Sequence, residues 1–287
     1  MGIDFDVFQN PEPTSALWKT WKCLVDTEGW TSDDNSVTQL TPSLKSTRSV
    51  FAVTKQDESF IGAVIWNEYD NISFIGFFIM APNYRGKGVG LKIWNQAVSL
   101  MPKSSVIVLR AVPNMVDKYR ASTTPVFGPK LINYRWSVAD FYKAIQSKGV
   151  DGYKPRFTTN GCKIDLDQEN FDKFVTGRQR KDFLRVYREL PFTQGMYLYD
   201  SGNRIAAHVE VVRTSNEDAN LYKIAPLYAR NEEIAFTALR EFSKMLLEKY
   251  PTADLLFHVL DTQNGQQIAK FFEEHGLEPH LRFFLFI

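Results

Sequence analysis

The sequence has little cysteine and no long apolar run, and each absence excludes a class of protein. Two cysteines occur among 287 residues, Cys23 and Cys162, and neither has a second metal ligand nearby at a regular spacing. The pattern excludes a disulfide scaffold and a zinc cluster, so we expect no metal. No apolar run approaches the roughly 18 residues that a membrane-spanning helix requires, so we expect no membrane partner.

Net charge is almost absent as well. Lysine and arginine number 34 and aspartate and glutamate 33, which gives +1 at neutral pH. A chain with so little net charge has no global field that attracts nucleic acid, and any anion site must be local. The first residues are acidic and no apolar run follows them, which predicts a cytoplasmic protein without a leader. Hydrophobic residues make up 44% of the chain, enough for a substantial core.

The two halves of the chain show a similar order of predicted elements. In the first half the periodicity predicts strands 49–54, 60–67 and 72–80, helix 89–100 and strand 105–112. In the second half it predicts strand 162–166, helix 171–190, a hairpin of 196–199 with 204–213, strand 221–228, helix 231–248, strand 255–260, helix 266–274 and strand 281–287. We therefore predict a duplicated α+β protein with domains 1–150 and 151–287.

A glycine-rich loop follows the predicted strand 72–80. Gly86, Gly88 and Gly90 let the backbone turn tightly, bring several N–H groups close to one ligand, and open a helix whose N-terminus is positive. The loop therefore predicts an anion site. The glycine spacing and the missing Lys-Ser/Thr pair exclude a Walker loop, and the hairpin context argues against a dinucleotide-binding fingerprint.

The second half differs at the corresponding position. There the strand runs into Asn231, Glu232 and Glu233, whose negative charge would oppose a diphosphate. We therefore expect a single anion site, in the first half. The strand 204–213 carries His208 and Glu210 two residues apart, so both side chains could face one side of a sheet, although a structural histidine is the default.

Residues 82–90, Pro-Asn-Tyr-Arg-Gly-Lys-Gly-Val-Gly, carry the Arg-x-x-Gly-x-Gly pattern of motif A in the GNAT N-acetyltransferases. The chain resembles that superfamily most strongly over residues 72–101. The resemblance implies a mixed, mostly antiparallel sheet flanked by helices, and acetyl-coenzyme A or another acyl-coenzyme A as co-substrate. It implies that the pyrophosphate binds the backbone of Arg85, Gly86, Lys87, Gly88, Val89 and Gly90, and that the pantetheine lies along Ile79 and Met80.

The layout of the whole chain resembles the two-copy GNAT proteins of the YitH/HolE type. That resemblance implies that the complete first copy holds the cofactor and that the altered second copy shapes the substrate side. After the strand 105–112, the stretch from Asn114 to Tyr119 resembles the asparagine-to-tyrosine stretch of the family. Tyr119 is therefore the candidate acid for the departing thiolate, with plain packing as the alternative.

Many relatives carry a glutamate on the strand before the glycine loop, but Phe74 occupies the matching position here. The base must then lie elsewhere, and Glu68 and Asp70 are candidates, either of which could instead be a solvated turn residue. The aromatic faces of Trp30 and Tyr69 would favour a cationic acceptor.

These features predict an acyl-coenzyme A-dependent N-acyltransferase that transfers acetyl to a small primary amine by direct attack in a ternary complex. Neither cysteine has a nucleophile setting, which favours direct transfer over an acyl-enzyme. Two alternatives remain open: a non-catalytic acyl-coenzyme A sensor, and a protein-lysine acetyltransferase. The oligomeric state does not follow from the sequence.

Overall fold

The computed structural model describes residues 3–29, 36–111, 115–121, 124, 126–191, 193–214, 220–279 and 281–286. The chain divides into two compact units. The first unit comprises Met1–Trp30, Leu40–Gly128 and Phe283–Ile287, and the second comprises Thr31–Gln39 and Pro129–Arg282. No helix in the part of the chain given above is long and apolar enough to cross a membrane.

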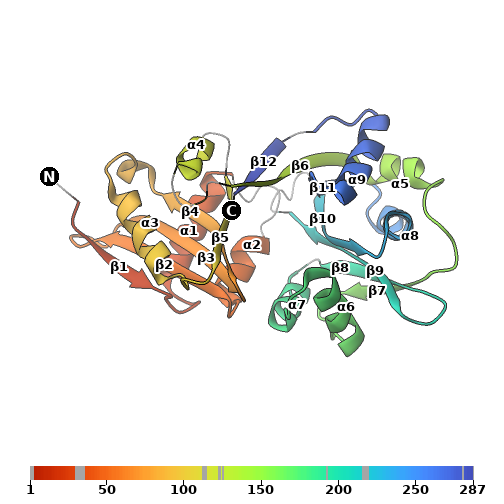
Figure 1. Cartoon of the computed structure of the whole chain (residues 1–287), viewed down its shortest axis with the longest axis horizontal. Helices are drawn as coiled ribbons and strands as arrows, with labels where there is room; N and C mark the ends of the chain where they lie inside the picture. The colour runs from red at the N-terminus through yellow and green to blue at the C-terminus, as the bar shows by residue number, and fades with distance from the viewer. Residues whose placement is uncertain are drawn as a thin grey trace. The chain divides into compact units, whose positions relative to one another are not determined.

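The first unit contains six neighbouring strands with helices on both faces (Figure 1). Its strands lie in the order β1-β2-β3-β4-β5-β12, and all neighbours with a recorded register are antiparallel except β4 and β5. The strands are β1 (Phe5–Gln9), β2 (Thr47–Thr54), β3 (Phe60–Tyr69), β4 (Ile72–Met80), β5 (Val106–Ala111) and β12 (Leu281–Phe286). The helical segments are α1 (Ala16–Thr27), η1 (Thr41–Ser43), η2 (Pro82–Tyr84), α3 (Val89–Leu100) and α4 (Val116–Arg120), while α2 (Ser36–Leu40) belongs to the second unit except for its last residue.

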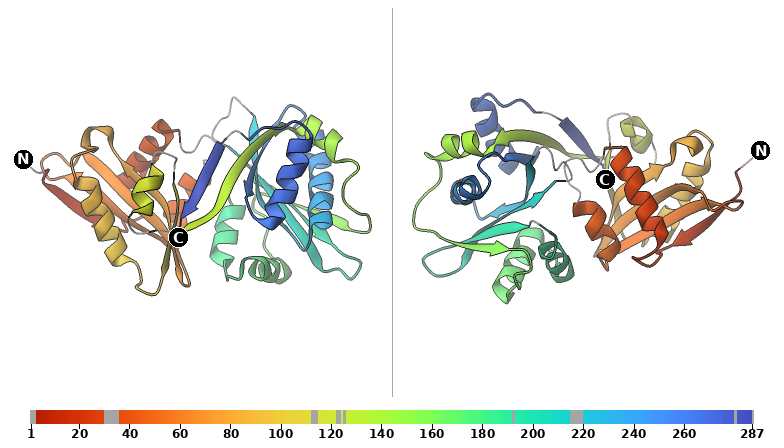
Figure 2. Two further views of the ribbon diagram at one scale, coloured as in Figure 1. Left: turned by 45° about the horizontal axis from the view of Figure 1, so that its top comes forward. Right: turned by 180° about the vertical axis from the view of Figure 1, so that it is seen from behind.

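Successive side chains of the strands in this unit pack into two hydrophobic cores, one on each face of the sheet. Val50 and Ala52 of β2 pack with α3, whereas Phe51 between them packs with α1. Because successive side chains of a strand point to opposite faces, α1 and α3 must cover opposite faces. Figure 2 shows α3 nearer the viewer in one view and α1 nearer in the other.

The second unit repeats this arrangement. Its strands lie in the order β6-β11-β10-β9-β8-β7, with β10 and β11 as the parallel pair. The strands are β6 (Phe127–Ser137), β7 (Lys154–Thr159), β8 (Gln194–Tyr199), β9 (Ile205–Arg213), β10 (Leu221–Ala229) and β11 (Asp254–Leu260). The helices are α5 (Val138–Ile145), α6 (Leu166–Thr176), α7 (Lys181–Arg188), α8 (Glu232–Lys249) and α9 (Gln263–Glu274).

The duplication predicted from the sequence is confirmed, with one difference in how the copies are assembled. Strands β1 to β5 correspond in order to β7 to β11, but the last strands are exchanged. β6 follows the first copy along the chain and pairs with β11, whereas β12 follows the second copy and pairs with β5. The predicted division at residue 150 therefore does not coincide with the two compact units.

Two predicted elements of the second half are wrong. Residues 162–166 form no strand, since the edge strand β7 ends earlier, at Thr159. The predicted helix 171–190 is two helices, α6 and α7, because Gly177 adopts a left-handed conformation (φ +69°) that ends α6.

Removal of residues 281–287 is expected to destabilise the first unit, although these residues follow the last helix of the second copy. β12 supplies the backbone partners of Leu109, Arg110 and Ala111, and its loss leaves β5 with an open edge. Hydrogen exchange followed by mass spectrometry should become faster in β4 and β5 than in β8 and β9. Faster exchange confined to β8 and β9 would contradict the exchange of strands.

Candidate functional site

The glycine loop predicted from the sequence joins β4 to α3 in the first unit. Gly86 and Gly88 adopt left-handed φ values of +71° and +77°, which favour glycine. Gly88 is the N-cap of α3, and no side chain caps the first turn of that helix. The loop residues 85–88 are exposed. The N–H groups of the first turn are therefore free to bind an anion from solution.

Contacts from neighbouring residues fix the position of this loop. The Arg85 Nε donates a hydrogen bond to the carbonyl oxygen of Met80 at 2.9 Å, and its guanidinium forms an ion pair with Glu28, which follows α1. A Cβ at Gly90 would lie 3.3 Å from the ring of Phe78, so this glycine lets α3 approach β4 closely. Lys87 is exposed and has no carboxylate partner in the portion of the chain that is described, which leaves its positive charge available.

β4 separates from β5 before it reaches the glycine loop. The parallel pairing of the two strands ends at Ile75 and Leu109, and Gly76 forms a bulge in the pairing of β4 with β3. Beyond this point β5 pairs with β12 alone, while β4 continues to Met80. In the part of the chain that the structure describes, the edge of β4 from residue 78 to residue 80 that faces away from β3 therefore has no strand partner. An extended ligand that carries amide groups can hydrogen-bond to such an edge.

The second unit has the same strand separation but a different helix terminus. Pairing of β10 with β11 ends at Ile224 and Phe257, and β10 is irregular just beyond. At this irregularity the Tyr187 hydroxyl donates a hydrogen bond to the Ala225 carbonyl oxygen at 2.5 Å. The Asn231 side chain accepts a hydrogen bond from the Ile234 N–H at 2.9 Å and so caps α8. The first turn of α8 also carries two glutamates, which disfavour an anion.

Tyr119 lies on α4 and is half-buried. Its ring packs against Trp94 of α3, with 5.5 Å between ring centroids. Burial raises the pKa of the Tyr119 phenol to about 12. The phenol therefore keeps its proton throughout the neutral range and can act as a hydrogen-bond donor. Asn114, which helped to single out Tyr119 in the sequence, lies outside the described residues.

The structure brings Glu68, Tyr69 and Asp70 together, in the hairpin between β3 and β4. This hairpin precedes β4 and the glycine loop follows it, so the two lie at opposite ends of the nine-residue strand, about 26 Å apart. The Glu68 Oε1 accepts a hydrogen bond from the Trp66 indole at 3.0 Å, and its Oε2 lies 3.3 Å from the Arg48 Nε. Both carboxylate oxygens are thus engaged. Trp30 lies outside the described residues.

Sequence reasoning missed Arg110, a cation near the end of the otherwise apolar strand β5. Ile107, Leu109 and Ala111 belong to the core beneath α3, so Arg110 points to the opposite face of the sheet. The guanidinium carbon lies 5.9 Å from the centre of the Phe74 ring. The signal in the sequence was the charge itself, which interrupts an apolar strand.

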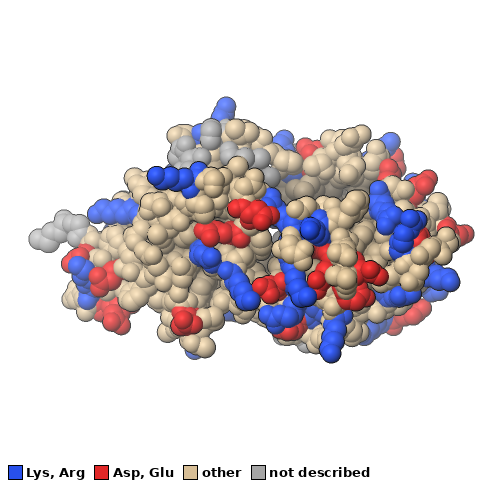
Figure 3. Space-filling model, turned by 60° about the horizontal axis from the view of Figure 1, so that its bottom comes forward, with Lys and Arg blue, Asp and Glu red and all other residues tan. Residues whose placement is uncertain are grey.

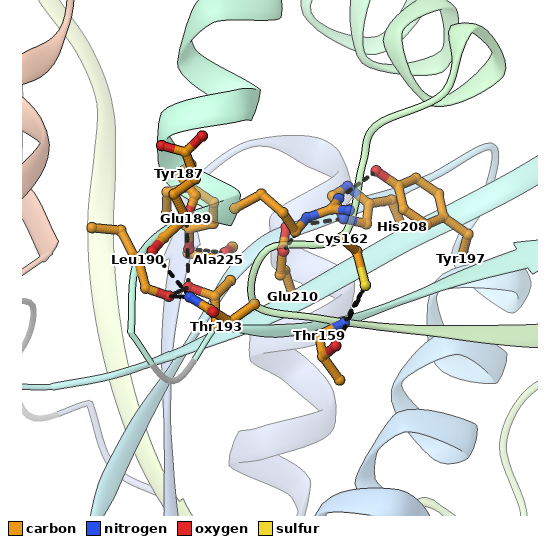
Figure 4. Close-up of polar contacts among 12 residues, drawn as sticks. Thr159, Cys162, Tyr187, Glu189, Leu190, Thr193, Tyr197, His208, Glu210 and Ala225 are labelled. Carbon is orange, nitrogen blue, oxygen red and sulfur yellow. Dashed lines mark hydrogen bonds and ion pairs between the residues drawn. The ribbon is translucent and has the colours of Figure 1, made fainter.

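A buried polar cluster joins α7 to β8 and β9 in the second unit (Figure 4). His208 and Glu210 face the same side, as predicted, and the His208 Nε2 lies 3.1 Å from the Glu210 Oε2. The Arg188 Nε lies 3.0 Å from the other oxygen of Glu210, and the His208 ring stacks on Tyr197 with 4.1 Å between centroids. All four side chains are almost fully buried, so loss of one charged partner would leave the opposite charge buried and uncompensated.

Charges elsewhere do not indicate a macromolecular ligand. Basic and acidic side chains are mixed on the face seen in Figure 3. Among the residues that the structure covers, no group of three or more His, Cys, Asp or Glu side chains could hold a metal ion.

Comparison with known proteins agrees with this geometry. Residues 14–117 match the model of the acetyltransferase (GNAT) family, and so include the glycine loop. The chain is 49% identical over 279 residues to the uncharacterized protein F36G3.2 of Caenorhabditis elegans, covering 96% of this chain and 88% of that protein. It is 26% identical over 179 residues to the holothin acyltransferase of a Pseudoalteromonas species, covering 62% of this chain and 55% of that protein.

A solved structure extends the likeness to both copies. The tandem GNAT protein from the clavulanic acid biosynthesis pathway superposes with a TM-score of 0.67 at 11% identity, covering 99% of this chain and 98% of that one. At this identity the likeness shows the fold. The family match over the first copy and the tandem fold of the whole chain lead to one conclusion. The chain belongs to the GNAT acetyltransferase family, and it has the fold of a tandem GNAT protein.

Proposed function

We propose that this protein is an N-acyltransferase that transfers acetyl from acetyl-coenzyme A to a small primary amine. The proposal rests on one observation: in the first copy, a strand with an open edge leads directly into a helix whose N-terminus is uncapped. The family supports acyl transfer from acyl-coenzyme A. The acceptor and the mechanism are our own inference.

In this proposal the pyrophosphate binds the N–H groups of the loop from Arg85 to Gly90, and Lys87 adds a positive charge beside it. The pantetheine follows the edge of β4 at Met80 and Ile79, where its amides replace a strand partner. The acyl thioester then lies toward Gly76, where β4 and β5 separate. Coenzyme A thus supplies the activated acyl group, and the protein positions it.

The chemistry requires a neutral amine to attack the thioester carbonyl. A C–N bond forms, the C–S bond breaks, the amine nitrogen loses a proton and the departing thiolate gains one. Tyr119 is our candidate for the group that assists the departing thiolate, while the proton released by the amine reaches the thiolate through solvent. With a pKa of about 12, its phenol is a weaker acid than a thiol of about 8.5. Its main contribution is therefore a hydrogen bond that stabilises the thiolate as it leaves.

Glu68 and Asp70 remain our candidates for accepting the amine proton. The Glu68 carboxylate is held by Trp66 and Arg48, so it would act through a water molecule rather than by a large movement. Phe74 offers no base, which is the feature that favours a second candidate function. A non-catalytic acyl-coenzyme A sensor would bind the cofactor in the same loop and release no coenzyme A with any amine.

Acetyl-coenzyme A is expected to bind once per chain, and Gly88→Asp should weaken binding at least tenfold. The new carboxylate would stand at the N-cap of α3, where it would compete with the pyrophosphate for the same N–H groups. Isothermal titration calorimetry measures both the stoichiometry and the affinity. Gly276→Asp is the matched control, because Gly276 has a similar φ of +79° and equally open surroundings in the second copy. Two equivalent sites per chain would contradict the assignment.

Tyr119→Phe is expected to lower kcat on the order of a hundredfold while the affinity for acetyl-coenzyme A stays within twofold. The substitution removes the hydroxyl and keeps the ring that packs on Trp94. The matched control is Tyr142→Phe on α5, in the second unit. A kcat equal to that of the wild type would mean that Tyr119 only packs.

The pH profile adds a second readout for Tyr119. Its pKa is raised above the ordinary 10 to about 12, so the protonated form persists through pH 10 and is lost only above that. The wild-type rate should therefore rise with pH as the acceptor amine loses its proton, without a decline between pH 8 and 10. A decline in that range that disappears in Tyr119→Phe would contradict the raised pKa.

A further inference from the structure

Arg110 occupies the point where β4 and β5 separate. The pairing of these strands ends at Leu109, and Arg110 is the next residue of β5, paired with Leu285 of β12. Its guanidinium lies over the ring of Phe74, the residue of β4 that precedes the last paired position, Ile75. Both side chains project from the face of the sheet opposite α3, since Ile75 and Leu109 pack beneath that helix.

The direction of the open edge of β4 determines which end of a bound ligand lies near Arg110. A ligand that binds its phosphates at the glycine loop and runs back along Met80 and Ile79 arrives at Gly76 and the last paired position. The end far from the phosphates, where the reacting group is, thus comes closest to Arg110. The pyrophosphate lies at the other end of the open edge. Arg110 is therefore placed for the acceptor rather than for the phosphates.

Arg110 also lacks the partner that an arginine usually has. Arg48 and Arg85 in the same unit contact Glu68 and Glu28. Arg110 makes no hydrogen bond or ion pair with any of the described residues, and its only recorded side-chain contact is with the Phe74 ring. The residue is exposed, although desolvation by the surrounding protein lowers the pKa of its guanidinium. A partly desolvated cation without an anion is a strong site for a carboxylate.

We propose that Arg110 binds a carboxylate of the acceptor, so that the substrate is a primary amine that also carries a carboxylate, as an amino acid does. The inference rests on the proposed transferase function and narrows its substrate class. A guanidinium repels an ammonium group, so a simple amine or polyamine would gain nothing from this residue. A carboxylate held in its planar fork would orient the amine toward the thioester. The carboxylate itself is unchanged by the reaction, which forms an amide and releases coenzyme A as its thiol.

The test compares acceptors that differ only in the anionic group. Coenzyme A release is measured with β-alanine against propylamine, with phenylalanine against phenethylamine, and with O-phosphoethanolamine against ethanolamine. The carboxylated member of at least one pair should have a kcat/KM at least tenfold higher than its partner. Preference for the phosphorylated member alone would overturn the choice of a carboxylate.

Arg110→Ala should lower kcat/KM for the preferred acceptor roughly ten- to hundredfold, with the KM for acetyl-coenzyme A unchanged. Arg110→Lys should recover part of the loss, because the charge remains and the planar fork does not. Arg156→Ala is the matched control: Arg156 is an exposed arginine over an aromatic ring in the second unit, and its loss should change neither constant. Thermal melting of each variant verifies that it is folded.

A binding measurement keeps the inference testable without turnover. With coenzyme A present, the N-acetyl derivative of the preferred acid should bind the wild type more tightly than the matched N-alkylacetamide, and Arg110→Ala should remove the difference. Equal binding of the two would overturn the inference. So would a loss of acetyl-coenzyme A affinity in Arg110→Ala, since Arg110 would then contact the cofactor. Turnover of amines without any preference for an acid would overturn the inference but leave the transferase function intact, whereas no release with any acceptor would overturn both.

Discussion

The separation of β4 from β5 is the constraint on which the site depends. A bulge at Gly76 changes the register of β4 against β3, and pairing with β5 stops at Ile75. Buried backbone groups are nearly always hydrogen-bonded, so a strand edge that stays open within a sheet needs either solvent or a ligand. The opening exposes the end of β4 to an extended ligand and delivers the chain to the glycine loop. It also leaves Arg110, the next residue of β5, at its apex.

The two copies share one strand arrangement and differ at the N-terminus of the helix that follows the separated strand. Both have the strand separation, at Ile75 in the first copy and at Ile224 in the second. The N–H groups at a helix terminus can be satisfied by a ligand or by the protein, but not by both. Gly88 has no side chain that could occupy them in α3, whereas the Asn231 side chain occupies one of them in α8. We therefore expect the two copies to differ in anion binding because of the N-cap residue and its neighbours, although their topology is the same.

The sequence was informative where a local pattern determines the structure. The strand 72–80 and the helix at 89–100 were predicted nearly to the residue, because alternation and helical spacing act over a few neighbours. The partner of a strand is not a local property. The strand β6, which begins with Phe127, Gly128 and Pro129, was not predicted, and the exchange of β6 with β12 could not have been. For the same reason the glycine loop was located, while the fact that Arg110 lies over Phe74 required the register between β4 and β5.

Recognition in this chain is local because its net charge is only +1. Long-range steering is weak for such a protein, and the free energy of binding must come from a few desolvated contacts. Most of its described arginines, such as Arg180 with Asp172 and Arg188 with Glu210, are neutralised within the fold. Basic side chains that have no carboxylate partner within the described part of the fold are the ones that can bind an anionic ligand. Lys87 at the glycine loop and Arg110 at the apex of the opening meet that condition at the two ends of the open edge of β4. In the complex that we propose, Lys87 lies at the anionic end of the cofactor and Arg110 lies at the reactive end, where the acidic acceptor binds.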